Sequence, residues 1–287
     1  MGQSTENFFY FIFTCSLLGG ITSLIAQKLH FYHLKNLPHK LFHFSHPILG
    51  LIGYIAITFL VAPLGMQWIN FTCKGILQAY PSLRLTMMQI LTFSFTVIYL
   101  IFFCLVQRKE TLKAIFIHSK RRHIRYLLTD FGLGILTWII AYPITALVSQ
   151  SIEWITYLIT DAPRVEQVAI QYFRLVKDSP YLLALALLMI ILLAPIIEEL
   201  VFRGFLYSYL KQKIGFKGAL FLSALLFALF HFSPSQGISN FPLLSSLFIL
   251  ALYLGFLYER QSSLLSPIAL HMTFNSISVM RILLFSN

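Results

Sequence analysis

The chain contains 287 residues, of which 58% are hydrophobic and only 11% are charged, and its formal net charge is +11. Soluble domains carry roughly 25% charged residues, so this composition excludes a water-soluble globule, a disordered chain and a nucleic-acid-binding module. The apolar residues run in continuous blocks and do not alternate, which argues against a transmembrane β-barrel. We therefore expect an all-α, polytopic transmembrane helical bundle.

Eight apolar segments are long enough to be membrane-spanning helices, each of which needs about 20 residues. In chain order they are residues 8–28, 47–70, 85–106, 127–149, 180–210, 218–233, 242–258 and 266–285. The stretch 150–179 is not expected to span the membrane. Its apolar residues recur at helical spacing among charges, which is typical of an amphipathic helix in the membrane interface. The residues in this pattern are Val165, Val168, Tyr172, Phe173 and Val176.

The distribution of Lys and Arg predicts the orientation of these spans. With the amino terminus outside, 14 basic residues fall in inner connections and six in outer ones, which satisfies the positive-inside rule. We therefore expect both termini outside and, from the compact size and lack of an organelle retention signal, a bacterial inner membrane. The basic stretch 107–125 lies between two spans and contains only one aromatic residue, Phe116, so membrane lipid is the expected partner and nucleic acid is not.

Two adjacent acids, Glu198 and Glu199, lie within the apolar fifth span. Each such group costs roughly 2.5–3.5 kcal/mol at the centre of a bilayer, so their presence points to a function. Glu199 and Arg203 are at i and i+4, in the order that favours an ion pair on one face of a helix. Glu198 points about 100° away and finds no partner on its own helix.

Polar residues on three spans are expected to reach one depth. The turn between the fifth and sixth spans should lie near residues 213–217, which places Glu199 and His231 each roughly 20 Å from it. His271 and Asn275, at i and i+4 on the last span, lie roughly 15–20 Å beyond the preceding turn. The sequence thus predicts one polar cavity, opening toward the inner face. Acids, histidines and an amide supply the base, proton carrier and oxyanion donors with which water hydrolyses an amide.

Three ordered motifs resemble those of the CPBP (Abi) family, which comprises type II CAAX prenyl endopeptidases and bacterial relatives linked to bacteriocin processing and immunity. The motifs are Glu198-Glu199 with Arg203, Phe227 with His231, and His271 with Asn275. The resemblance covers roughly residues 180–280. It implies a catalytic membrane domain at 180–287, preceded by amino-terminal spans, basic inner loops and an interfacial segment at 1–179.

The resemblance also implies a mechanism. Glu198 and His231 would activate water, His271 and Asn275 would hold the oxyanion, and Arg203 would orient the paired glutamate. The activity would be that of an intramembrane endopeptidase acting on a membrane-associated or lipidated peptide. The eukaryotic branch of the family suggests a prenylated cysteine as the substrate.

Several alternatives remain open at this point. Zinc accepts imidazole and carboxylate ligands, so a metal held by Glu198, Glu199, His231 and His271 is chemically reasonable. The nearby Arg203 charge and the asparagine favour metal-free water activation, and no cofactor is therefore expected. The zincin motif His-Glu-x-x-His is absent from the sequence. A catalytically silent scaffold or immunity protein, or an ion-coupled transporter, would use the same residues differently.

Overall fold

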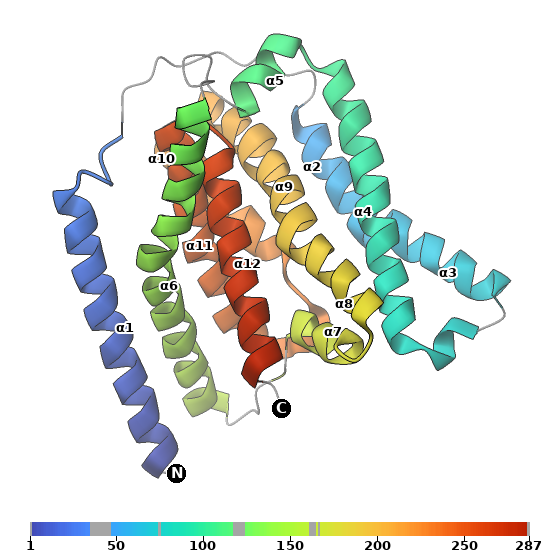
Figure 1. The fold of residues 1–287 in the computed structure, drawn as a ribbon, viewed down its shortest axis with the longest axis horizontal. Helices are drawn as coiled ribbons and strands as arrows, with labels where there is room; N and C mark the ends of the chain where they lie inside the picture. Colours follow the sequence, from blue (N-terminus) through green and yellow to red (C-terminus); the bar gives the residue numbers. More distant parts are fainter. Residues whose placement is uncertain are drawn as a thin grey trace.

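The structure is a computed structural model that describes residues 2–34, 47–73, 76–116, 124–160, 165 and 167–285. Throughout these residues the chain is helical and forms no strand, as its composition predicts. Figure 1 shows a bundle of long helices whose two termini lie at the same end. An even number of crossings produces this arrangement.

The helices of the amino-terminal part lie on two sides of the carboxy-terminal ones. They are α1 (Gly2–Lys28), α2 (Pro47–Ala56), the π-helix η1 (Ile57–Val61), α3 (Ala62–Thr72), the 3-10 helix η2 (Ile76–Ala79), α4 (Pro81–Val106), α5 (Lys109–Phe116), α6 (Ile124–Thr160) and α7 (Val168–Val176). The helices of the carboxy-terminal part follow. They are α8 (Pro180–Leu187), the π-helix η4 (Leu188–Leu193), α9 (Ala194–Glu199), the π-helix η5 (Leu200–Tyr207), α10 (Ser208–Phe230), the 3-10 helix η6 (Pro234–Ser239), α11 (Asn240–Gln261) and α12 (Leu265–Phe285).

Seven helical stretches among the described residues are long and apolar enough to cross a membrane. The longest, Pro180–Phe230, has 51 residues and would reach roughly 75 Å if straight, well beyond the hydrocarbon core. It reverses direction at Gly215, whose φ of 75° suits glycine. The rings of Phe202 and Phe227 therefore meet, with centroids 5.2 Å apart. This turn makes two crossings from one stretch, in keeping with the eight predicted.

One prediction for the segment before residue 180 needs correction, and another is tested only in part. The fourth span does not end at residue 149, because α6 continues to Thr160. Polar residues such as Glu153 lower the local hydropathy, but they do not end a helix. The amphipathic helix is present as α7, yet Tyr172, Phe173 and Val176 are buried in a cluster with Ala186 and Val279. This part of the apolar face packs against α4, α8 and α12, whereas Val165 and Val168 are exposed. The amphipathic helix is thus confirmed, and its position in the membrane interface stays a prediction.

The amino-terminal helices hold the carboxy-terminal ones from two sides. On one side α6 lies between α1 and the pair α11 and α12, and on the other α2 packs against η5 and α4. Glycine allows α2 this close approach, since a Cβ at Gly50 would lie 3.0 Å from Phe103 and 3.3 Å from Phe205. A Cβ at Gly53 would overlap the ring of Tyr99. Small residues permit such contact between membrane helices.

Candidate active site

Glu198 and Glu199 end a short α-helix, α9, that lies between two π-helical segments. The π-helix η4 has hydrogen bonds that span five residues. The N–H of Ala194, for example, donates to the carbonyl of Met189. All eight residues of η5 are buried. Interruptions of this kind occur frequently at functional sites, because they re-aim the side chains that follow.

Arg203 and Glu199 form the ion pair predicted from their spacing. The distance from Nη1 to Oε1 is 3.1 Å, and the two side chains are 1% and 0% exposed. The second guanidinium nitrogen donates to the carbonyl of Ala251 on α11, also at 3.1 Å, and the guanidinium lies 4.5 Å from the centroid of the Phe227 ring. Partners from three helices thus hold the buried Arg203 charge in place.

His271 contacts both glutamates with its two ring nitrogens. Nδ1 lies 2.9 Å from Oε1 of Glu199, and Nε2 lies 3.9 Å from Oε2 of Glu198. The Glu199 carboxylate accepts from Arg203 and from Nδ1 of His271, so Nδ1 carries the proton of the neutral imidazole. In the neutral ring Nε2 then carries a lone pair directed toward Glu198.

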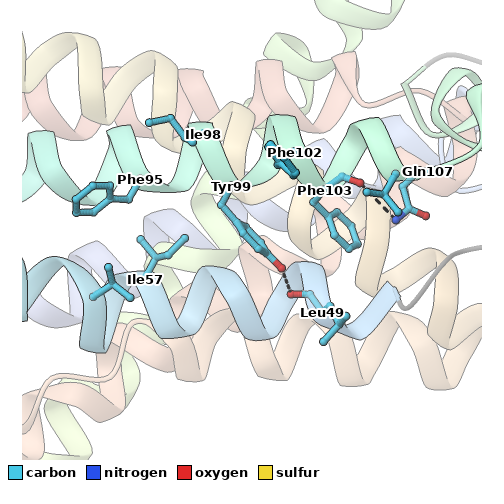
Figure 2. Close-up of a pocket in the computed structure, with 10 residues that line it drawn as sticks. Leu49, Ile57, Phe95, Ile98, Tyr99, Phe102, Phe103 and Gln107 are labelled. Atoms are coloured by element: carbon cyan, nitrogen blue, oxygen red, sulfur yellow. Dashed lines mark hydrogen bonds between the residues drawn. The ribbon is translucent and has the colours of Figure 1, made fainter.

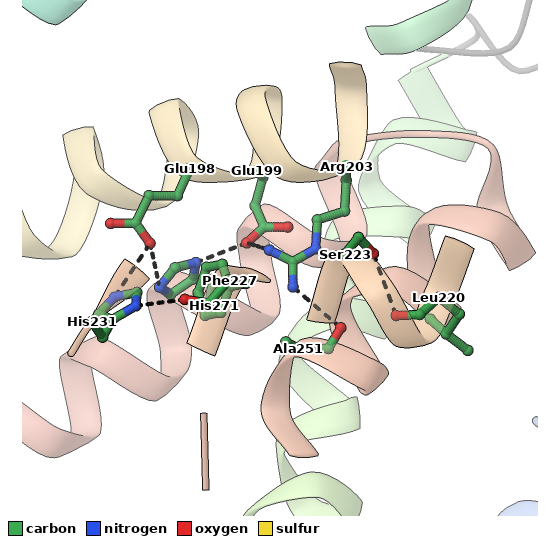
Figure 3. A network of polar contacts seen from close by, with 9 residues as sticks. All are labelled: Glu198, Glu199, Arg203, Leu220, Ser223, Phe227, His231, Ala251 and His271. Atoms are coloured by element: carbon green, nitrogen blue, oxygen red, sulfur yellow. Dashed lines mark hydrogen bonds and ion pairs between the residues drawn. The ribbon is translucent and has the colours of Figure 1, made fainter. Parts of the chain in front are cut away.

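His231 approaches Glu198 from α10. Its Nδ1 lies 2.9 Å from the carbonyl oxygen of Phe227, which can only accept, so Nδ1 carries the proton. Its Nε2 lies 3.8 Å from Oε2 of Glu198. Figure 3 shows the resulting arrangement, with the two imidazoles on one side of Glu198 and the Arg203 pair beyond. Within the described chain this carboxylate oxygen makes no hydrogen bond.

Exposure falls steadily across the cluster. The side chain of His231 is 30% exposed, that of Glu198 10%, that of His271 6% and that of Glu199 0%. The site therefore has an accessible end at His231 and a closed end at Glu199. The wall between them is Phe227, whose ring centroid is 4.9 Å from that of His231 and 5.8 Å from that of His271.

Asn275 lies one turn beyond His271 on α12 but contacts a different partner. Its amide nitrogen donates to the carbonyl of Ile190 in η4, at 2.9 Å. In the register of η4 this carbonyl would accept from the N–H of residue 195, which is proline and has none. The bond to Asn275 thus satisfies a carbonyl that Pro195 leaves without its helical donor. The shared face of His271 and Asn275 was predictable, whereas this backbone partner was not.

The structure brings together five of the six predicted residues: Glu198, Glu199, Arg203, His231 and His271. Two further contributors were not predicted. The aromatic wall of Phe227 belongs to a quoted motif, but its contacts depend on the reversal at Gly215. Tyr54 on α2 interacts electrostatically with Glu198, and its position in a plain apolar run contains no signal of this.

A cavity of about 570 Å³ lies elsewhere, between α2–η1 and α4. Its lining is almost wholly apolar and includes Leu49, Ile57 and Phe102, with Gln107 at one end (Figure 2). None of the six predicted site residues lines it. The chemistry of the site and this apolar groove are therefore separate features.

Comparison with protein families gives one match for the carboxy-terminal part of the chain. The family model described as type II CAAX prenyl endopeptidase Rce1-like matches residues 180–277. The similarity thus covers the carboxy-terminal part of the chain alone. Neither a curated protein nor a solved structure matches the chain. The spanning helices indicate a multi-pass integral membrane protein, and residues 180–277 of it are similar to type II CAAX prenyl endopeptidases.

The polar side chains of the site are also of the kinds that bind a metal ion. Two imidazoles and a carboxylate are ligands that zinc accepts. Among the described residues, however, no group of three or more histidine, cysteine or acidic side chains has the arrangement of a metal site. The zinc alternative from the sequence is therefore left to a direct test.

Proposed function

We propose that this CAAX-type endopeptidase cleaves a membrane-associated, lipidated peptide with water activated by Glu198 and His231. The observation that carries the proposal is the position of Glu198 Oε2, which faces two imidazole Nε2 atoms at 3.8 and 3.9 Å and makes no hydrogen bond in the described chain. A carboxylate with free lone pairs beside an imidazole acceptor is suited to remove a proton from water.

The two glutamates would divide the chemistry between them. Glu199 is occupied by Arg203 and His271, so it orients the neighbouring imidazole and does not meet substrate. Glu198 would take the proton of the attacking water, and His231 would help to pass it to the departing amine. The accessible end of the site at His231 is where a peptide bond would enter.

His271 and Asn275 would stabilise the oxyanion, as the family resemblance implies. The amide nitrogen of Asn275 has two N–H groups, and its bond to Ile190 uses one of them. For Nε2 of His271 to donate to the oxyanion, the ring must carry a proton on both nitrogens, because Nδ1 donates to Glu199. These contributions would act as the carbonyl oxygen gains charge.

The test uses the purified full chain in liposomes and an internally quenched, farnesylated peptide that ends in a CAAX sequence. We expect fluorescence to rise with the unmodified protein and not with Glu198→Gln, and mass spectrometry to find two peptide products. Activity that persists in Glu198→Gln would refute the proposed mechanism. A scaffold or a transporter would cleave nothing in either form. Proteomics of cleaved termini in membranes would then identify the natural substrate.

The same preparation tests the zinc alternative. A metal-free mechanism predicts that a chelator leaves the rate unchanged and that metal analysis finds far less than one zinc per chain. If zinc were catalytic, His271→Ala would release it, whereas Asn275→Ala would retain it. If the unmodified protein contained one zinc per chain and His271→Ala contained none, the proposed metal-free activation of water would be wrong.

We also propose that the protein lies in a bacterial inner membrane with both termini outside, on the strength of its basic inner connections. Single cysteines at Ser119 and Asp161, both outside the described residues, test this in a background without native cysteine. Ser119→Cys should react only with reagent on the inner side and Asp161→Cys only on the outer side. Reversed labelling would contradict the orientation.

A further inference from the structure

Tyr54 brings another hydroxyl toward the site from α2, a helix outside the matched segment 180–277. Its side chain is 6% exposed and belongs to the same buried cluster as Ile197 and Val201, which flank the two glutamates. Its ring stacks on that of Phe230, with centroids 4.7 Å apart and an interplanar angle of 23°. Since Phe230 immediately precedes His231, this stacking fixes the phenol beside the accessible end of the site.

The hydroxyl of Tyr54 is not used by the fold. It interacts electrostatically with the Glu198 carboxylate, but within the described residues it forms no hydrogen bond. A buried tyrosine hydroxyl usually finds a partner, so one without a partner calls for an explanation. Other tyrosine hydroxyls in the bundle do have one. Tyr99 bonds to Leu49, Tyr172 to Thr86, Tyr207 to Glu259 and Tyr258 to Ser208.

The site itself is short of donors on the side of Glu198. The guanidinium of Arg203 donates to Glu199 and to the Ala251 carbonyl, and Nδ1 of His231 donates to a backbone carbonyl. Asn275 uses one of its two N–H groups on the Ile190 carbonyl of η4 and has only the other for the oxyanion. A carbonyl oxygen that becomes negatively charged needs preorganised donors aimed at it. Tyr54, whose ring stacks on Phe230 beside His231, has such a donor available.

We propose that Tyr54 is a further catalytic residue, whose phenolic O–H donates to the scissile carbonyl oxygen as that oxygen becomes an oxyanion. This inference rests on the proposed function. The water oxygen bonds to the carbonyl carbon, a water proton passes to Glu198, and the carbonyl π electrons move onto the oxygen, which accepts the hydrogen bond from Tyr54. When the C–N bond breaks, the amine takes the proton held by Glu198. Tyr54 keeps its own proton throughout.

The substitution Tyr54→Phe tests this role, because it removes the hydroxyl and keeps the ring that stacks on Phe230. With the farnesylated, quenched peptide in liposomes, we expect kcat to fall about 10²-fold with KM unchanged, as for loss of one oxyanion donor. Tyr99→Phe is the matched control. It removes a hydroxyl that bonds to α2 but lines no part of the polar cluster, and it should leave kcat unchanged.

An inhibitor that resembles the tetrahedral intermediate distinguishes a catalytic role of Tyr54 from a structural one. The probe is the same farnesylated peptide with its scissile amide replaced by a ketone that hydrates. Tyr54→Phe should raise the inhibition constant of this probe by the same factor by which it lowers kcat. Unchanged inhibition, unchanged kcat, or an equal loss in Tyr99→Phe would each overturn the inference. If Glu198→Gln is inactive and Tyr54→Phe is fully active, the proposed function stands and only the role of Tyr54 falls.

Discussion

The two ends of the polar cluster contain the same kinds of group in different states. At the closed end Glu199 is fully buried and bonded to Arg203 and His271 at 3.1 and 2.9 Å. At the accessible end Glu198 is partly exposed and lies 3.8 Å from His231 without a hydrogen bond. The two acids are neighbours in the sequence, so helix phase and surrounding helices decide that one is a fixed partner and the other a free base.

The largest effect should come from the accessible end. Replacing Glu198 by glutamine removes the base but leaves no charge without its partner, because among the described residues no basic side chain lies within hydrogen-bond distance of it. We expect kcat to fall by about 10⁴-fold, the upper range for a general base, while thermal unfolding is unchanged. Both are measured on one detergent preparation. A marked loss of stability in this variant would contradict the proposed difference between Glu198 and Glu199.

The matched substitution Glu199→Gln should instead destabilise the fold. It leaves the Arg203 charge buried without its counter-ion, a change that costs about 3–5 kcal/mol in buried pairs. The free energy of unfolding in mixed micelles measures it. The double variant Glu199→Gln with Arg203→Met should recover much of the lost stability, because no unpaired charge remains. If the double variant does not regain stability, the unpaired Arg203 charge is not the cause of the loss.

His231 offers an intermediate effect at the accessible end. His231→Ala removes the imidazole that faces Glu198 but keeps the base itself, so we expect kcat to fall about 10²-fold. The control His33→Ala changes an exposed histidine far from this cluster in the sequence and should have no effect. A larger loss than that of Glu198→Gln would mean that the imidazole is the principal base.

The smallest effect concerns the contact between α12 and η4. Asn275→Ala should cost about 1–3 kcal/mol of stability, because it leaves the Ile190 carbonyl without a donor in an apolar interior. Pro195→Ala restores the missing N–H. In that background the cost of Asn275→Ala should shrink, and a double-mutant cycle measures the difference. Purely additive effects would contradict the explanation given for this bond.

Periodic and local features were open to prediction from the sequence. Apolar runs of about 20 residues locate the spans, the spacing of Glu199 and Arg203 predicts their pair, and the separations from the turns place the acids and histidines at one depth. These inferences depend only on helix geometry, which is the same in any helix. They therefore locate the helices, but they misplace the end of a helix that continues through polar residues, as α6 does to Thr160.

Contacts between helices were decided by the tertiary structure. The π-helical register of η4 and the missing N–H of Pro195 together direct Asn275 to a backbone carbonyl, and neither the register nor the partner is encoded in a motif. The approach of α2, which Gly50 permits, brings the ring of Tyr54 onto that of Phe230, beside His231, from a distant part of the sequence. Side chains so far apart meet only through packing, and packing depends on the shapes of all the helices at once.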